Sequence, residues 1–261
     1  MLAQVVNRVR MYRLMFAFRR QVCNWREAWT AFRTRTPGVT LRLRDGLVIR
    51  GDYRDNVASI FSEIFVDRCY TPAWFYRPEP GHTVLDVGAN IGLFCLHLSA
   101  VSSGIHVLAF EPHPETFNRL RRNLAENRLE GTVTARQVAV SRGPGEVRFS
   151  GITGLQSGHE SATTTGLGEA VECIGLSEAL ALAHGRPIDL LKVDTEGAEV
   201  EIITCAPLAV WSRIARVVVE YHDLGKRDQV VESLEGSGYR CRIKPSPGYE
   251  HFLGLIYATR P

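Results

Sequence analysis

The chain has 261 residues, of which 45% are hydrophobic and 23% are charged, and its net charge is +3. These values are ordinary for a soluble globular protein, and the length allows one well-buried α/β domain with an N-terminal appendage. So small a net charge gives no argument for a nucleic acid partner.

The sequence also argues against a membrane-spanning or secreted protein. No apolar stretch approaches the roughly 20 residues that cross a bilayer. The arginine-rich start lacks the apolar core of about 7–15 residues of a signal peptide. The cysteines show no metal-ligand spacing, so we expect reduced thiols in a cytoplasmic protein. They are Cys23, Cys69, Cys95, Cys173, Cys205 and Cys241.

Positive charge is concentrated at the N-terminus, where residues 1–35 hold eight arginines and a single acid, Glu27. Apolar residues recur there at three- and four-residue spacings, which predicts a basic, amphipathic helical segment over residues 1–38. Two interpretations stay open. The helices pack on the main domain or on a second copy of the chain, or they lie on an anionic membrane as a peripheral contact.

Residues 39–80 are predicted to cap the core domain. Val39 to Arg50 alternates around an Asp45-Gly46 turn, which indicates a hairpin. Tyr53 to Tyr70 is amphipathic, with helical spacing, and ends before Thr71-Pro72.

From residue 81 to 261 the pattern alternates between short apolar runs and amphipathic segments, which predicts a parallel sheet with helices on both faces. The predicted strands are Thr83–Val87, His106–Phe110, Val133–Val140, Ala170–Ile174, Ile188–Val193, Ala215–Tyr221, Tyr239–Ile243 and Phe252–Thr259. The predicted helices are Leu93–Ala100, Pro114–Asn127, Ser177–Ala183, Ala198–Cys205 and Asp228–Gly236.

The stretch from Ser141 to Glu169 is rich in Gly, Ser and Thr, apart from a short predicted strand at Glu146–Phe149. Such a segment is either a mobile connection or a lid that orders over a ligand.

A strand, a tight turn and a helix follow one another at Val84-Leu85-Asp86-Val87-Gly88-Ala89-Asn90-Ile91-Gly92, and the next strand ends in Glu111. Glycines let a ligand approach bare backbone, and an acid at the next strand tip can accept both ribose hydroxyls. Only two glycines remain of the dinucleotide pattern, which disfavours a nicotinamide enzyme. The combination fits a nucleoside without a diphosphate, and S-adenosylmethionine is the obvious candidate.

Acids cluster after two later strands. Asp194 follows a buried strand, at the edge where open α/β sheets bind ligands. Glu196 and Glu199 come next, where the helix dipole alone also favours acids. Glu220 and His222 end a β-branched run on one face, so His222 is a candidate general base with a carboxylate nearby.

Hard oxygen ligands in this group could also hold a divalent cation. We do not favour that interpretation, because a hydrogen-bonding network for a hydroxylated acceptor explains the same residues. The set is Asp194, Glu196, Glu220, His222 and Asp223.

Four blocks together resemble the FkbM family of S-adenosylmethionine-dependent methyltransferases, over about residues 50–258. They are Asp86-Val-Gly-Ala-Asn-Ile-Gly92, Phe110-Glu-Pro-His-Pro114 with Asn123-Leu124, Lys192-Val-Asp-Thr-Glu-Gly-Ala-Glu199, and Glu220-Tyr-His222. The resemblance implies a class I (Rossmann-like) seven-stranded sheet whose last strand is antiparallel. It also implies O-methylation of a sugar, polyketide or similar hydroxyl.

The resemblance assigns roles to two sets of residues. The cofactor set is Asp86, Gly88, Asn90 and Gly92 around methionine and ribose, Glu111 on the ribose hydroxyls, Ala139 and Ser141 at the adenine, and Tyr70 as a closing side chain. The acceptor set is His222, Asp194, Glu220 and Glu196.

Two alternative functions are less compatible with the sequence. A non-catalytic module that binds the cofactor or a glycan at a membrane-associated assembly has no evident need for the intact acids. A nucleic acid methyltransferase is disfavoured because the chain lacks an Asp/Asn-Pro-Pro-Tyr/Phe tetrapeptide and its core is not basic. The sequence does not identify the acceptor molecule.

Overall fold

The computed structural model describes residues 2–149, 169–246 and 253–260. Most of the stretch rich in Gly, Ser and Thr, predicted as a connection or a lid, lies outside the described residues (150–168), as does the start of the strand predicted from Phe252.

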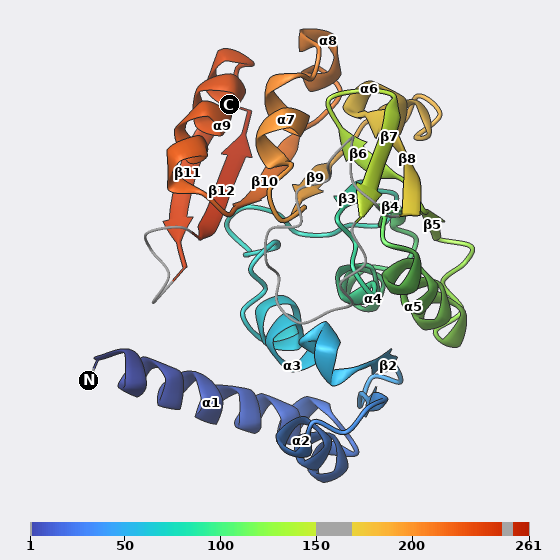
Figure 1. Ribbon diagram of the computed structural model, residues 1–261, viewed down its shortest axis with the longest axis vertical. Coiled ribbons are helices and arrows are strands. Elements are labelled where there is room, and N and C mark those ends of the chain that lie inside the picture. Colours follow the sequence, from blue (N-terminus) through green and yellow to red (C-terminus); the bar gives the residue numbers. More distant parts are fainter. Residues whose placement is uncertain (1, 150–168, 247–252, 261) are drawn as a thin grey trace.

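A seven-stranded sheet forms the centre of the fold, in the order β11-β12-β10-β9-β3-β4-β5 (Figure 1). β12 runs antiparallel to both neighbours, whereas β3, β4, β5, β9 and β10 pair in parallel. This arrangement confirms the predicted α/β class and the antiparallel last strand. The strands are β3 (Thr83–Val87), β4 (His106–Phe110), β5 (Val133–Arg136), β9 (Leu190–Val193), β10 (Arg216–Tyr221), β11 (Arg240–Pro245) and β12 (Gly254–Thr259).

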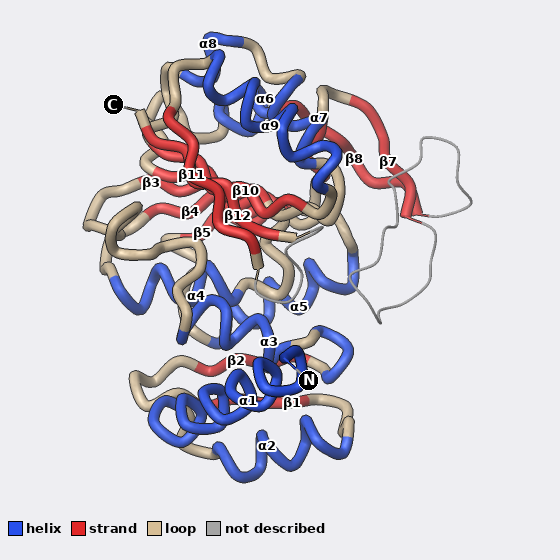
Figure 2. Tube along the Cα trace, turned by 90° about the vertical axis from the view of Figure 1, so that its left-hand side faces the viewer, coloured by secondary structure: helices blue, strands red, loops and turns tan. Residues whose placement is uncertain are grey.

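Helices cover both faces of this sheet (Figure 2). One face carries α4 (Leu93–Val101) and α5 (Pro114–Glu126), and the other carries α6 (Leu176–Ala181), α7 (Glu199–Thr204), α8 (Leu208–Trp211) and α9 (Leu224–Gly236). Alternate side chains of one strand enter two separate apolar clusters, as Val84 and Leu85 do. Central strands are therefore apolar at nearly every position, as strands buried on both faces require.

The N-terminal elements lie together at one end of the molecule (Figure 1). They are α1 (Leu2–Gln21), α2 (Trp25–Thr34) and the antiparallel hairpin of β1 (Val39–Arg42) and β2 (Val48–Gly51). The predicted hairpin is confirmed. Phe18 of α1 is fully buried against the rings of Trp29, Phe32 and Phe61. None of the helices in the described chain is both long and apolar enough to cross a bilayer.

The single helix predicted from Tyr53 to Tyr70 is wrong. The chain forms a 3-10 turn (Tyr53–Asp55), α3 (Val57–Phe61) and a π-helical turn (Ser62–Val66). Asn56 and Arg68 take left-handed backbone angles, with φ of 50° and 48°, and a right-handed helix cannot continue through such residues.

The predicted strand Val133–Val140 is also wrong, because it is divided between two sheets. β5 ends at Arg136, and β6 (Ala139–Ser141) pairs in parallel with β8 (Glu169–Gly175), which pairs with β7 (Gly145–Phe149). Val140 packs in the main core and Ala139 in a separate small cluster. The apolar run is continuous in sequence, but its side chains serve two different cores.

On one face of the sheet, the structure differs from the prediction at two helices, α8 and α9. α9 begins at Leu224, earlier than predicted, because the Asp223 carboxylate accepts the Gly225 N–H at 2.8 Å and caps the helix. α8 was not predicted, since its single turn is too short to show a periodicity.

Asn123 on α5 joins the N-terminal hairpin to the core. Its side-chain oxygen accepts the Arg50 N–H at 2.8 Å, and its amide nitrogen donates to the carbonyls of Arg50 (2.9 Å) and Ile91 (2.8 Å). One turn later, the Asn127 side chain accepts a hydrogen bond from the Val48 N–H and donates one to the Val48 carbonyl. The side-chain amides of Asn123 and Asn127 therefore hydrogen-bond to the backbone of β2, as a neighbouring strand would.

We therefore expect Asn123→Ala to lower the free energy of unfolding by about 1–3 kcal/mol, because the backbone groups of Arg50 and the carbonyl of buried Ile91 lose their partner. Urea denaturation measures the change. Arg122→Ala, an exposed neighbour on the same helix, is the control and should shift stability by less than about 0.5 kcal/mol. Equal stability of the two variants would contradict this role of Asn123.

Candidate functional site

The glycine turn after β3 is pressed against the backbone that follows β9. Gly88 has φ of +79°, and a Cβ at this position would lie 1.7 Å from the Asp194 carbonyl oxygen. The N–H groups of Gly88 and Ala89 both donate to the Phe110 carbonyl at the end of β4. Only glycine fits position 88, so the turn is locked to two neighbouring strands at once.

Glu111 follows β4 and faces the same turn. Its carboxylate accepts the Asn90 N–H at 2.9 Å and the His113 N–H at 3.0 Å. Burial raises the pKa of Glu111 to about 7, against the lowering effect of these two hydrogen bonds. Asn90 takes φ of 51°, and Gly92, with φ of 89°, precedes the first residue of α4. The structure thus brings together the predicted turn residues and Glu111.

Lys192 is the buried centre of the site. It lies opposite Asp86 in the β3–β9 register, and its ammonium is 3.0 Å from Asp86 Oδ1, 2.7 Å from the Gly88 carbonyl and 3.6 Å from Asp194 Oδ2. Burial opposes the charge, yet Asp86 and Asp194 raise the pKa of Lys192 above its ordinary value. The ammonium therefore stays charged and connects the turn to the acids.

Tyr70 lies among the predicted acceptor acids. Its hydroxyl oxygen is 2.9 Å from Asp194 Oδ2 and 2.5 Å from Glu220 Oε2, and its ring lies 5.1 Å from the Lys192 ammonium. A phenol has one proton for these two carboxyl groups. Burial and the Asp194 charge raise the pKa of Glu220 to about 8, which favours its protonated form beside the Tyr70 hydroxyl.

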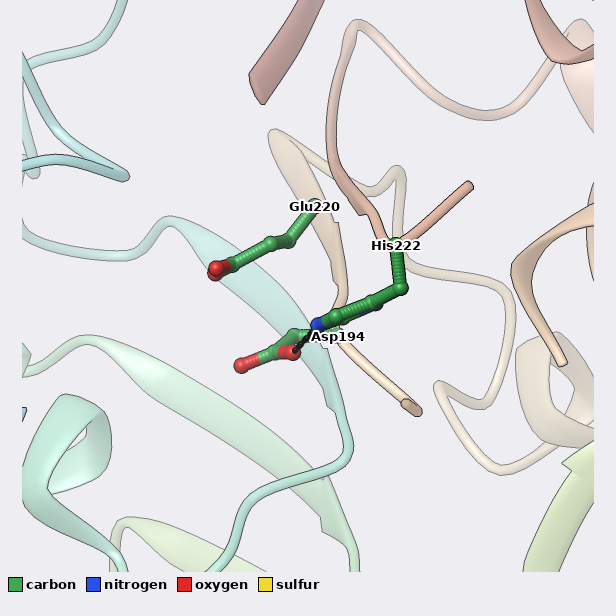
Figure 3. Close-up of side chains that lie close together, drawn as sticks. All are labelled: Asp194, Glu220 and His222. Carbon is green, nitrogen blue, oxygen red and sulfur yellow. Dashed lines mark ion pairs between the residues drawn. The ribbon is translucent and has the colours of Figure 1, made fainter. Parts of the chain in front are cut away.

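His222 points back toward Asp194 from the end of β10 (Figure 3). Its Nδ1 lies 2.8 Å from Glu199 Oε1, while Nε2 lies 3.3 Å from Glu196 Oε2 and 3.9 Å from Asp194 Oδ1. An ionised carboxylate only accepts, so Nδ1 carries a proton and donates it to Glu199. This fixes the ring and aims Nε2 at the place where β9 and β10 end.

The electrostatic surroundings favour the imidazolium form of His222. Burial lowers its pKa, but the Glu199 hydrogen bond and the charges of Asp194 and Glu196 outweigh burial and raise the pKa to about 9. Glu199 is itself held by the N–H groups of Thr195 and Gly197 at 3.3 and 3.0 Å. The histidine is therefore a stronger base than an isolated imidazole, but it is available as a base only at raised pH.

Three of the predicted ligands could also hold a divalent cation. Within the described part of the chain, ligand atoms of Asp194, Glu220 and His222 all lie within 4.8 Å of one another. Asp223, in contrast, caps α9. Lys192 already neutralises part of the Asp194 charge, so a metal-free site stays our prediction.

Ala139 and Ser141 make contacts with the small sheet and with α7. The Ala139 side chain packs with Val147, Val171 and Cys173 in the small sheet, and the Ser141 hydroxyl donates to Glu201 on α7 at 2.9 Å. Their adenine role stays a prediction that these side-chain contacts do not support. The sequence alone assigned no role in the site to Lys192, which pairs with Asp86, or to Glu199, which contacts the His222 ring. For Lys192 a signal was available, because it is a lysine within an otherwise apolar strand.

The chemistry of the donor set suits S-adenosylmethionine. Each Glu111 oxygen has a lone pair beyond its backbone hydrogen bond, which a ribose hydroxyl can use. Asp194 and Glu196 supply negative charge next to the turn, where a sulfonium would be stabilised.

The strand order, the antiparallel last strand, the glycine turn and the acid after the second strand define a class I, Rossmann-like methyltransferase. Residues 86–241 match the Methyltransferase FkbM domain. The chain belongs to the FkbM methyltransferase family.

Two curated relatives illustrate the similarity. The 31-O-demethyl-FK506 methyltransferase FkbM of Streptomyces tacrolimicus is 33% identical over 238 residues, which cover 80% of this chain and 91% of the relative. The hexuronic acid methyltransferase AglP of Haloferax volcanii is 31% identical over 144 residues, which cover 55% of this chain and 57% of the relative.

A solved structure shows the same fold. The crystal structure of Methyltransferase FkbM from Methylobacillus flagellatus KT superposes with a TM-score of 0.53 at 14% sequence identity. The match covers 79% of this chain and about half, 53%, of that chain.

The position of Lys192 leads to a stability prediction. Lys192→Met leaves Asp86 buried without its counter-charge. We therefore expect the free energy of unfolding, measured by urea denaturation, to fall by about 3–5 kcal/mol. The double variant Asp86→Asn with Lys192→Met should recover part of that loss, because no unpaired charge remains. The exposed Lys226→Met is the control. A double variant no more stable than Lys192→Met would argue against the ion pair.

Proposed function

We propose that the protein transfers a methyl group from S-adenosylmethionine to a hydroxyl oxygen of a small molecule or glycan. The observation that carries the proposal is the placement of two groups of residues on either side of Lys192. The glycine turn and Glu111 form one side, and Asp194, Tyr70, Glu220 and His222 form the other.

The names of the relatives support an oxygen acceptor. One relative is named for 31-O-demethyl-FK506 and the other for a hexuronic acid. Both compounds bear hydroxyl groups, and a carboxylate–histidine cluster is the kind of site that positions and deprotonates a hydroxyl.

The turn residues and Glu111 would hold the cofactor, which when bound supplies an electrophilic methyl group on a positively charged sulfur. The contribution of the protein is then largely placement of the acceptor oxygen in line with the methyl carbon and sulfur. Proximity and orientation of this kind are worth roughly 7–11 kcal/mol.

His222 is our candidate for the group that removes the hydroxyl proton, with Asp194 as the alternative or as its partner. Glu199 orients the ring and raises its pKa, so Nε2 accepts a proton and the resulting imidazolium is stabilised by Asp194 and Glu196. General-base assistance adds about 10²–10⁴-fold to the rate.

Calorimetric titration with S-adenosylmethionine and S-adenosylhomocysteine tests the cofactor site. We expect micromolar binding that Glu111→Ala abolishes, because the variant removes the ribose acceptor. Glu115→Ala changes an exposed acid on the neighbouring helix and should bind like the unaltered protein. No binding in folded protein would favour a non-catalytic module.

The pH dependence tests His222. The raised pKa of about 9 keeps the ring protonated at pH 7, where roughly 1% is free base, so kcat/KM should rise with pH, reach half its maximum near pH 9 and level above it. Glu199→Gln keeps an acceptor oxygen but removes the charge, and it should move the rise to lower pH. A profile that is flat from pH 6 to 9 would exclude His222 as the base and point to Asp194.

A further inference from the structure

A cationic edge lies beside the acceptor acids, on the outermost strand β11. Arg242 and Lys244 are both exposed there. In the antiparallel register Lys244 lies opposite Leu255, and Leu255 lies opposite Glu220. Paired residues share a face of the sheet, so Lys244 is on the same face as Glu220, two strand spacings or about 10 Å away.

Arg242 is held in place by aromatic rings on that face. Its guanidinium carbon lies 4.4 Å from the centroid of Trp74, a ring that is 54% exposed, and Trp74 packs on Tyr257 at 4.9 Å. The Tyr257 hydroxyl donates to the carbonyl of Cys69, the residue before Tyr70. Contacts therefore run from Arg242 through Trp74 and Tyr257 to the backbone next to Tyr70.

Neither cation has an anionic partner among the described residues. Arg242 contacts the Trp74 ring and interacts electrostatically with Tyr257, and neither Arg242 nor Lys244 forms an ion pair or a side-chain hydrogen bond within the described part of the chain. Arg242 is exposed, and its guanidinium lies over the Trp74 ring. A planar guanidinium presented this way binds a carboxylate or phosphate through two parallel hydrogen bonds.

The two ends of this surface have opposite charge. Asp194 and Glu196 repel an anion, while Lys244 and Arg242 attract one. An acceptor with a hydroxyl at one end and an anionic group at the other would therefore bind in a single orientation, with its hydroxyl toward His222.

We propose that the methyl acceptor is a hydroxylated acid, whose anionic group binds Arg242 and Lys244 while its hydroxyl lies at the Asp194–His222 end. This inference rests on the proposed O-methyl transfer. Lys244 and Glu220 are about 10 Å apart across the sheet, with Arg242 and His222 displaced in opposite directions along the strands, which suits a molecule of one sugar ring or slightly more that carries a carboxylate or phosphate.

The test compares acids with their neutral amides in protein saturated with S-adenosylhomocysteine. The probes are glucuronate, galacturonate and gluconate with the corresponding amides, and the measurement is the dissociation constant from ligand-observed NMR at low salt. We expect at least one acid to bind about 10-fold more tightly than its amide, and 0.5 M NaCl to remove most of that preference.

Arg242→Gln and Lys244→Gln should each reduce the preference for the acid several-fold. Arg260→Gln is the matched control, because Arg260 makes the same kind of cation–π contact with Tyr239, a ring that packs in the core on the opposite face of the sheet. Equal affinity for acid and amide in every pair, binding of no probe, or equal effects of the three variants would overturn the inference. Failure of the proposed function shows separately, as an absence of S-adenosylhomocysteine binding.

Discussion

The buried ammonium of Lys192 is the interaction on which the site depends. It bonds the carbonyl of the glycine turn, pairs with Asp86 beneath that turn and lies 3.6 Å from Asp194. A lysine buried in a central strand is unfavourable unless fixed carboxylates surround it. The two halves of the site are therefore held at one separation by electrostatics, and the close contact of Gly88 with the Asp194 backbone enforces the same spacing by sterics.

The sign of the charged side chains changes with distance from Lys192. The turn and Glu111 offer a buried acid where a ribose would bind, the acceptor cluster concentrates carboxylates where a sulfonium would lie, and the edge strand β11 carries exposed cations. The negative charge of the cluster is limited, because the Tyr70 hydroxyl lies within hydrogen-bond distance of both Asp194 and Glu220 and the raised pKa of Glu220 favours its protonated form. The result is a site that is negative where methyl transfer would occur and positive at its rim.

The N-terminal elements are coupled to the same site, although they precede the matched family domain. Asn123 binds the hairpin at Arg50 and the glycine turn at the Ile91 carbonyl with one side chain. Phe18 of α1 inserts between the aromatic residues of the neighbouring helices. These contacts tie the hairpin to the backbone that would support the cofactor, and they agree with the interpretation that the N-terminal helices pack on the main domain.

The sequence by itself determined most of the strands, the glycine turn and the acids that follow several strands, because apolar runs, glycines and strand ends are local properties. Glu111, Asp194, Glu220 and His222 were located in this way. Tertiary structure alone decided which side chains meet. The β3–β9 register paired Lys192 with Asp86, chain packing brought Tyr70 to Asp194, and separate cores divided the run that ends in β6. Such contacts depend on strand register and on burial against distant segments, which no local pattern encodes.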